Sequence, residues 1–230
     1  MTGAVQLSRR LPSPNHNATF SPSGSVWTSQ IASPGKILIL DPATLETTAE
    51  VAVDNSPAEV TFPASGTYGF VANTDSDTVS ILDPATGAIV ETVAVGDGPV
   101  GAWPGIDGRM YVDNEVGKSI SVIDPATRSV VATFPLGFTP ALAAIAPGGE
   151  LWVTDTENGK LVFFDATTGT KRGELATGAG AHAIAFADGV KAYITNQTAG
   201  TVSVIDIASK QVIKTITVGA KPNGLVYRKR

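Results

Sequence analysis

Two histidines, His16 and His182, are the residues of this sequence best suited to acid–base or metal chemistry. His16 lies four residues before Phe20, and His182 lies four residues before Phe186, so the two hold equivalent places in two similar segments. An imidazole at such a place can bind a divalent transition metal together with a carboxylate, or exchange a proton near neutral pH. Two residues do not make a site, and the sequence favours coincidence over a metal site because isolated motifs are weak signals.

The segments that contain the two histidines belong to a repeat. The Asp of an LDPATG-like tract recurs after 42, 41, 41 and 41 residues, at Asp41, Asp83, Asp124, Asp165 and Asp206. A second marker keeps step with it, an aromatic residue three positions before an amide or an acid, at Trp27, Phe70, Tyr111, Trp152 and Tyr193. A fixed period of this length indicates a repeat architecture.

Each repeat is predicted to form four short strands. In the second repeat these are expected at Pro57–Pro63, Tyr68–Asn73, Thr78–Leu82 and Ile89–Val95. Apolar and polar residues alternate in short runs bounded by Gly, Asn, Asp and Pro, and no stretch has the period of a helix. Such units repeated end to end favour a β-propeller, whose blades bury their faces against one another around a central channel. We therefore predict an all-β chain of four-stranded antiparallel blades, with residues 1–230 as a single domain.

Both repeat markers are expected to build the blades. The repeated Asp can accept a hydrogen bond from the backbone two residues further on, and Gly87 and Gly169 can adopt positive φ. The tracts are thus predicted to be turns between third and fourth strands, and their even distribution, one per blade, argues against calcium sites. The aromatic residues of the second marker are predicted to fill the core between blades.

The ends of the chain leave the number of blades open. Thr2, Gly3 and Ala4 match a tract that precedes a fourth strand, which predicts a fourth strand at Ala4–Arg10, and a first strand is predicted at Pro222–Arg230. Five complete repeats lie between the two. The chain then forms five blades with end strands added, or six blades of which one is partial, or it lacks a segment before Thr2.

Several tracts carry a family resemblance. With FVANTDSDTVSILDPATG, AYITNQTAGTVSVIDIASK and the KPNG near its C-terminus, the chain resembles the YVTN family of β-propellers over nearly its whole length. The resemblance implies the propeller fold. It implies no single function, because members of that family look alike while serving as surface-layer, periplasmic or enzyme-associated propellers.

The composition excludes several classes of protein. A net charge of −5 and a pI near 5.0 argue against nucleic acid or an anionic membrane as partner. The chain has no cysteine, which excludes disulfides and cysteine-ligated metals. No apolar run is long enough to span a membrane, and no phosphate loop or dinucleotide fingerprint is present. We expect a periplasmic or extracellular location; the N-terminus lacks the apolar core of a signal peptide, as the mature form of an exported protein would.

One face of the predicted propeller collects the candidate site. In antiparallel blades, the start of each first strand and the turn between the second and third strands share a face, which we name the front face. Several acids are expected there and should make it negative: Glu59, Asp75, Asp77, Asp113, Glu115, Asp155 and Glu157. Glu59 and Asp113 are the acids predicted nearest the channel. The predicted ligand-binding residues are His16, Asn17, Glu59, Trp103, Asp113 and His182.

Two functions stay open. The first is an exported binding protein that holds a small molecule or a protein partner at the channel mouth, which the absence of any catalytic motif favours. The second is a metal-dependent propeller enzyme of the lyase or lactonase kind, with His16, His182 and an acid around a divalent metal. The tract GGELWVTDTENGKL resembles a repeat of bacterial streptogramin-lyase propellers, over one blade only.

Overall fold

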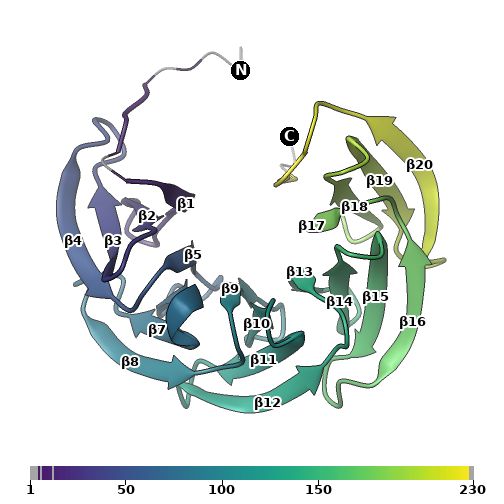
Figure 1. The fold of residues 1–230 in the computed structure, drawn as a ribbon, viewed down its shortest axis with the longest axis horizontal. Coiled ribbons are helices and arrows are strands. Elements are labelled where there is room, and N and C mark those ends of the chain that lie inside the picture. The colour runs from purple at the N-terminus through teal and green to yellow at the C-terminus, as the bar shows by residue number, and fades with distance from the viewer. Residues whose placement is uncertain (1–4, 6, 12, 228–230) are drawn as a thin grey trace.

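The computed structural model describes residue 5, residues 7–11 and residues 13–227. Within them, strands form five four-stranded antiparallel sheets, which follow one another as blades of an arc around a common centre (Figure 1). The only helical element of this described part is a single 3-10 turn, η1 (Thr74–Ser76). No helix of the described residues is long and apolar enough to cross a membrane. The predicted all-β chain of four-stranded antiparallel blades is confirmed.

In every blade the strands pair in the order of the sequence, with the first strand toward the centre of the arc and the fourth at its rim (Figure 1). The first and second blades contain β1 (Asn15–Phe20), β2 (Val26–Gln30), β3 (Gly35–Leu40) and β4 (Thr47–Val53), then β5 (Pro57–Thr61), β6 (Gly69–Asn73), β7 (Thr78–Leu82) and β8 (Ile89–Ala94). The third blade contains β9 (Pro99–Pro104), β10 (Met110–Asn114), β11 (Ser119–Asp124) and β12 (Ser129–Pro135). The fourth and fifth contain β13 (Pro140–Ile145), β14 (Glu150–Asp155), β15 (Lys160–Asp165) and β16 (Lys171–Ala176), then β17 (Ala181–Ala187), β18 (Lys191–Asn196), β19 (Thr201–Asp206) and β20 (Gln211–Thr217).

The core lies between the blades, because each second and third strand buries apolar side chains on both faces. Trp27 packs edge-on against Phe62 of the next blade with ring centroids 5.3 Å apart, and Trp152 packs in the same way against Phe186 at 5.5 Å. Four of the five repeated aromatics are at most 1% exposed, as predicted: Trp27, Phe70, Tyr111 and Trp152. Tyr193 is only half-buried, since no further described blade follows the fifth.

The predicted turn chemistry is also confirmed. Asp41 Oδ1 accepts a hydrogen bond from the backbone N–H of Ala43 at 2.8 Å, and Asp165 repeats this bond with Thr167 at 2.9 Å. Gly87 adopts a φ of 75° four residues after its own turn Asp. These bonds hold the chain reversal at the rim and leave the front face to other residues.

The end segments do not form the strands expected of them within the described residues. Residues 7–11 and 222–227 run without strand pairing, while residues 4, 6 and 228–230 of the predicted strands lie outside the described part. Figure 1 shows both segments at a gap between the first and fifth blades. A strand requires a neighbour to pair with, and the described chain offers none there. The described blades therefore number five, in an open arc.

Candidate functional site

A pocket of about 840 Å³ lies at the centre of the arc. It is lined by the first strand of all five blades and by residues 223–225, and we name it the channel pocket. Five of the six predicted ligand-binding residues line it: His16, Asn17, Glu59, Trp103 and His182. The repeat explains this convergence, because the first strand of every blade brings the same positions to the same mouth.

The His16 imidazole, on β1, is paired with Glu59 of β5. His16 Nδ1 lies 3.1 Å from Glu59 Oε1, and the side chains are 37% and 15% exposed respectively. The hydrogen bond to Glu59 raises the pKa of His16, which opposes the smaller lowering effect of burial. This pair can hold a proton near neutral pH, and the carboxylate fixes the orientation of the ring.

His182 occupies the equivalent position on β17 and has a different neighbour. Its Nδ1 lies 3.1 Å from the backbone oxygen of Asn223, and burial lowers the pKa of the imidazole. A carbonyl oxygen only accepts, so Nδ1 must carry the proton and the neutral ring presents Nε2 as an acceptor. Two charged groups of the first two blades also act on His182: the His16 charge lowers its pKa, and the Glu59 charge raises it.

Trp103 and Asp113 form a buried pair in the third blade. The indole Nε1–H donates to Asp113 Oδ1 at 2.5 Å, and Asp113 is 0% exposed. Gly101 makes room for the ring, because a Cβ there would lie 2.5 Å from the indole. Desolvation holds the pKa of Asp113 well above its usual range. Asp113 thus holds the Trp103 ring in place by this hydrogen bond and is not part of the pocket lining, contrary to its prediction as a ligand-binding residue.

Glu115 lines the channel pocket although the ligand-binding prediction did not include it. Burial raises its pKa, and the His16 charge opposes that rise. It makes no ion pair with any described residue. The available signal was its place in the turn between second and third strands, which by itself predicts only an acid of the front face.

Asn17 lines the channel pocket but both ends of its amide are occupied. Nδ2 donates to the backbone oxygen of Val60 at 2.9 Å, and Oδ1 accepts from the Val60 N–H at 3.0 Å. The side chain therefore joins the first blade to the second in the manner of a strand pair. The expectation that it orients a ligand would require these bonds to open.

The channel pocket offers few ligands for a metal ion. In the part of the chain that the structure describes, no group of three or more His, Asp or Glu side chains is arranged to hold one. His16 and His182 point their Nδ1 atoms at other partners.

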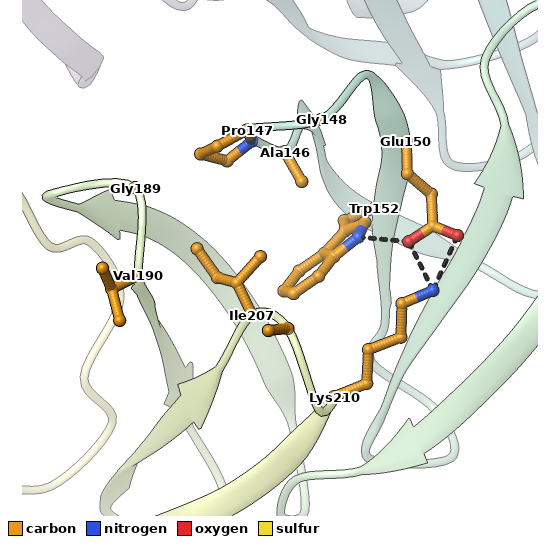
Figure 2. A pocket seen from close by; sticks show the side chains of 10 residues that line it. Ala146, Pro147, Gly148, Glu150, Trp152, Gly189, Val190, Ile207 and Lys210 are labelled. Atoms are coloured by element: carbon orange, nitrogen blue, oxygen red, sulfur yellow. Dashed lines mark hydrogen bonds and ion pairs between the residues drawn. The ribbon is translucent and has the colours of Figure 1, made fainter.

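A second, smaller pocket lies between the fourth and fifth blades, at the face opposite the front face (Figure 2). Its volume is about 420 Å³. Its polar groups bind one another: Glu150 accepts from Trp152 Nε1 at 2.9 Å and forms an ion pair with Lys210 at 2.7 Å. Lys210 Nζ also lies 4.6 Å from the centre of the Phe163 ring. The polar groups of this pocket join two blades and are already bonded to one another, so the channel pocket is the better candidate site.

No protein-family model and no curated protein matches the chain. Its fold is similar to that of a streptogramin B lyase, with a TM-score of 0.77, 16% identity, and coverage of 94% of this chain and 74% of the other. The virginiamycin B lyase of Staphylococcus aureus has a TM-score of 0.74 and 14% identity, with coverage of 91% of this chain and 73% of the other. The hydrazine synthase of Kuenenia stuttgartiensis has a TM-score of 0.66 and 17% identity, with coverage of 98% of this chain and 92% of the other. At such identities the similarity shows the fold and not the activity. The chain is thus a β-propeller.

Proposed function

We propose that the protein is a binding propeller whose channel pocket holds a small cationic ligand, such as a primary amine or a quaternary ammonium compound. The observation that carries the proposal is the presence of Trp103 and Glu115 in one lining. An aromatic ring and a carboxylate attract a cation together, the first by its quadrupole and the second by its charge.

The charges of the other groups leave Glu115 as the free anion of the channel pocket. Glu59 is offset by His16, whose raised pKa favours the imidazolium form. Burial favours the protonated, neutral form of Asp113. Glu115 feels the His16 charge but makes no ion pair with a described residue, and it shares the pocket lining with the apolar residues Ile31, Leu142 and Leu225. Apolar walls with a few polar groups are typical of small-molecule sites.

Trp103 provides the readout for a test. Trp27 and Trp152 are 0% and 1% exposed, so changes in indole fluorescence on adding a ligand should come from Trp103. Choline and a series of primary amines should change the emission in a saturable way, and carboxylates of matched size should not. Glu115→Gln should weaken binding about tenfold, equal to about 1.4 kcal/mol.

Glu91→Gln, at an exposed position of β8, is the matched control and should bind as the parent does. Binding of the carboxylates in preference to the amines would contradict the proposal. So would equal affinity in the Glu115→Gln variant.

The pH dependence follows from the direction of the Glu115 shift. Because its pKa is raised above the ordinary value of 4.5, the carboxylate should be lost on acidification before an ordinary exposed glutamate is protonated. Affinity for choline should therefore fall as the pH drops through that raised pKa. A titration by fluorescence from neutral to acidic pH checks this, and a flat profile would show that Glu115 does not bind the cation.

A second candidate function is acid–base catalysis, which the oriented His16–Glu59 pair favours. Its test uses the substrate class that the name of one protein of similar fold gives, a streptogramin B antibiotic. The antibiotic is incubated with the protein with and without Mg²⁺ and followed by liquid chromatography with fragmentation mass spectrometry, which also detects a product of unchanged mass. A new product that is lost in His16→Asn would favour the enzyme. An intact antibiotic after long incubation would leave the binding function as the better account.

A further inference from the structure

The contact between blades has the same form at two of the described boundaries. An aromatic side chain on the second strand of one blade meets a Phe near the end of the first strand of the next, as Trp27 meets Phe62 and Trp152 meets Phe186. A hydroxyl two residues after the aromatic donates across the same boundary: Thr154 Oγ1 donates to the His182 oxygen at 2.7 Å. The two sides of the gap can be compared with this pattern.

On the side of the fifth blade, residues 222–227 take the place of a further first strand. Thr195, the equivalent of Thr154, donates to the backbone oxygen of Asn223 at 3.2 Å, just where the pattern puts the equivalent of His182. Tyr227, the equivalent of Phe186, donates to Asp188 Oδ2 at 2.6 Å. The segment is therefore docked against the fifth blade.

On the side of the first blade, residues 7–11 take the place of a preceding fourth strand. Arg9 donates to the backbone oxygen of Leu45 at 2.8 Å and pairs with Glu46 at 2.7 Å, at the turn between β3 and β4. Val51 of β4 is the equivalent of Arg9 one repeat later, and it lies against the corresponding turn of the next blade. A Cβ on Gly87 of that turn would lie 3.0 Å from the Val51 side chain. Both end segments thus keep the register of the repeat.

The side chains at the gap lack the cover that their equivalents have. Phe20 is equivalent to Phe62 and Phe186 but is 67% exposed, with no described aromatic against it. In segment 222–227 no backbone group is hydrogen-bonded to the backbone of another described residue, although the Asn223 oxygen accepts from the side chains of Thr195 and His182. A docked segment that is not paired in a sheet is a ready edge for another strand, and an exposed aromatic beside it is a ready contact.

We propose that the gap between the first and fifth blades binds a β-hairpin of another protein, which adds to residues 222–227 by backbone pairing and presents an aromatic side chain to Phe20. The hairpin takes the places of the second and third strands of a blade, between the first-strand place of residues 222–227 and the fourth-strand place of residues 7–11. This surface continues the interface that already joins every described pair of neighbouring blades. Strand addition of this kind derives affinity from main-chain bonds and specificity from alternate side chains.

The probe for the test is a fluorescein-labelled peptide with the sequence of residues 190–210, which contains β18, β19 and the aromatic Tyr193. Its anisotropy on titration with the full chain should saturate at one peptide per chain, and a scrambled peptide should not bind. Phe20→Ala should weaken binding about tenfold, as expected for the loss of one aromatic contact. Ile106→Ala, at an exposed site of the third blade, should change nothing.

Leu225→Pro and Val226→Pro form an internal control. Successive N–H groups of a strand point to opposite edges, so only one of the two substitutions should abolish peptide binding. Binding that survives both, or that is unchanged by Phe20→Ala, would overturn the proposal. A dimer of the chain alone that depends on Phe20, detected by sedimentation, would overturn the choice of another protein in favour of a second copy, whether or not the peptide binds.

Discussion

The first and fifth blades present the same repeat positions to different neighbours. His16 and His182 are equivalent, yet the pKa of His16 is raised by its hydrogen bond to Glu59 and that of His182 is lowered by burial. The difference arises in the following segment, which provides a carboxylate beside His16 and a backbone carbonyl beside His182. The repeat sets where a side chain points, and the neighbouring blade sets its energetics.

The same comparison holds for two phenylalanines. Phe186 packs on Trp152 of the fourth blade, whereas Phe20 has no described blade before it and is 67% exposed. One position of the repeat therefore serves as core in one blade and as surface in another. A contact between blades is made only where both blades are present.

The largest effect should appear when these two phenylalanines are removed. Phe186→Ala should lower the free energy of unfolding by about 2 to 3 kcal/mol, less than for a fully buried Phe because the ring is half-buried, and Phe20→Ala should change it by less than about 0.5 kcal/mol. Urea denaturation of both variants measures the difference. Equal losses would mean that the first blade is covered in solution in the absence of any partner.

A smaller effect is expected in the third blade, where Asp113 replaces the bridging hydroxyl of Thr154 and Thr195. Asp113 Oδ2 has no described partner, and a protonated carboxyl could donate from there as the hydroxyls do. Asp113→Asn keeps an acceptor for Trp103 and provides a donor that does not titrate. It should match the parent in stability below about pH 4 and exceed it by about 1 kcal/mol at neutral pH.

The sign follows from the raised pKa of Asp113. Below the ordinary value of 3.8 the carboxyl is protonated in the folded and unfolded chains alike. As the pH rises above that value, the unfolded chain loses the proton while the folded chain keeps it, so the parent loses stability until the pH reaches the folded pKa. Denaturation at several pH values checks this. A variant that is less stable than the parent at neutral pH would show that Asp113 is ionised when folded.

The strands could be predicted because their signals are local. Alternation and turn residues placed the strands of the second blade at Tyr68–Asn73 and Thr78–Leu82, and the structure has them at Gly69–Asn73 and Thr78–Leu82. The end segments carry the same local signals, but a strand also needs a partner, and none lies beside them in the described chain. Local pattern fixes the place of residues 222–227 and not their pairing.

The candidate site could be predicted only where the repeat alone decides. It brought His16, Glu59 and His182 to one mouth, since first strands share an end. It did not reveal the burial of Asp113, which lies opposite Gly101 in the regular register of β10 and β9. The Trp103 ring lies over Gly101 and covers Asp113 there. The alternation of residues along a strand does not show which way a neighbouring side chain folds.

The smallest effect should come from removing Glu59, the partner that makes the pKa values of the two histidines differ. The chain has only these two imidazoles, so NMR titration should show two midpoints, with that of His16 above and that of His182 below the ordinary value of 6.5. Glu59→Gln should lower the His16 midpoint toward that of His182, and should lower the His182 midpoint slightly because Glu59 also acts on it. Glu91→Gln should move neither.

Stability should follow with the sign of a raised histidine pKa. The contribution of the His16–Glu59 pair is complete below the ordinary pKa of 6.5, as long as Glu59 stays ionised, and is lost as the pH rises through the raised pKa of His16. The parent should thus exceed Glu59→Gln in stability only on the acidic side of that transition, and by a small margin because His16 is more than a third exposed and solvent screens the pair. If the His16 midpoint did not move in Glu59→Gln, the contrast between the two blades would have to come from burial alone.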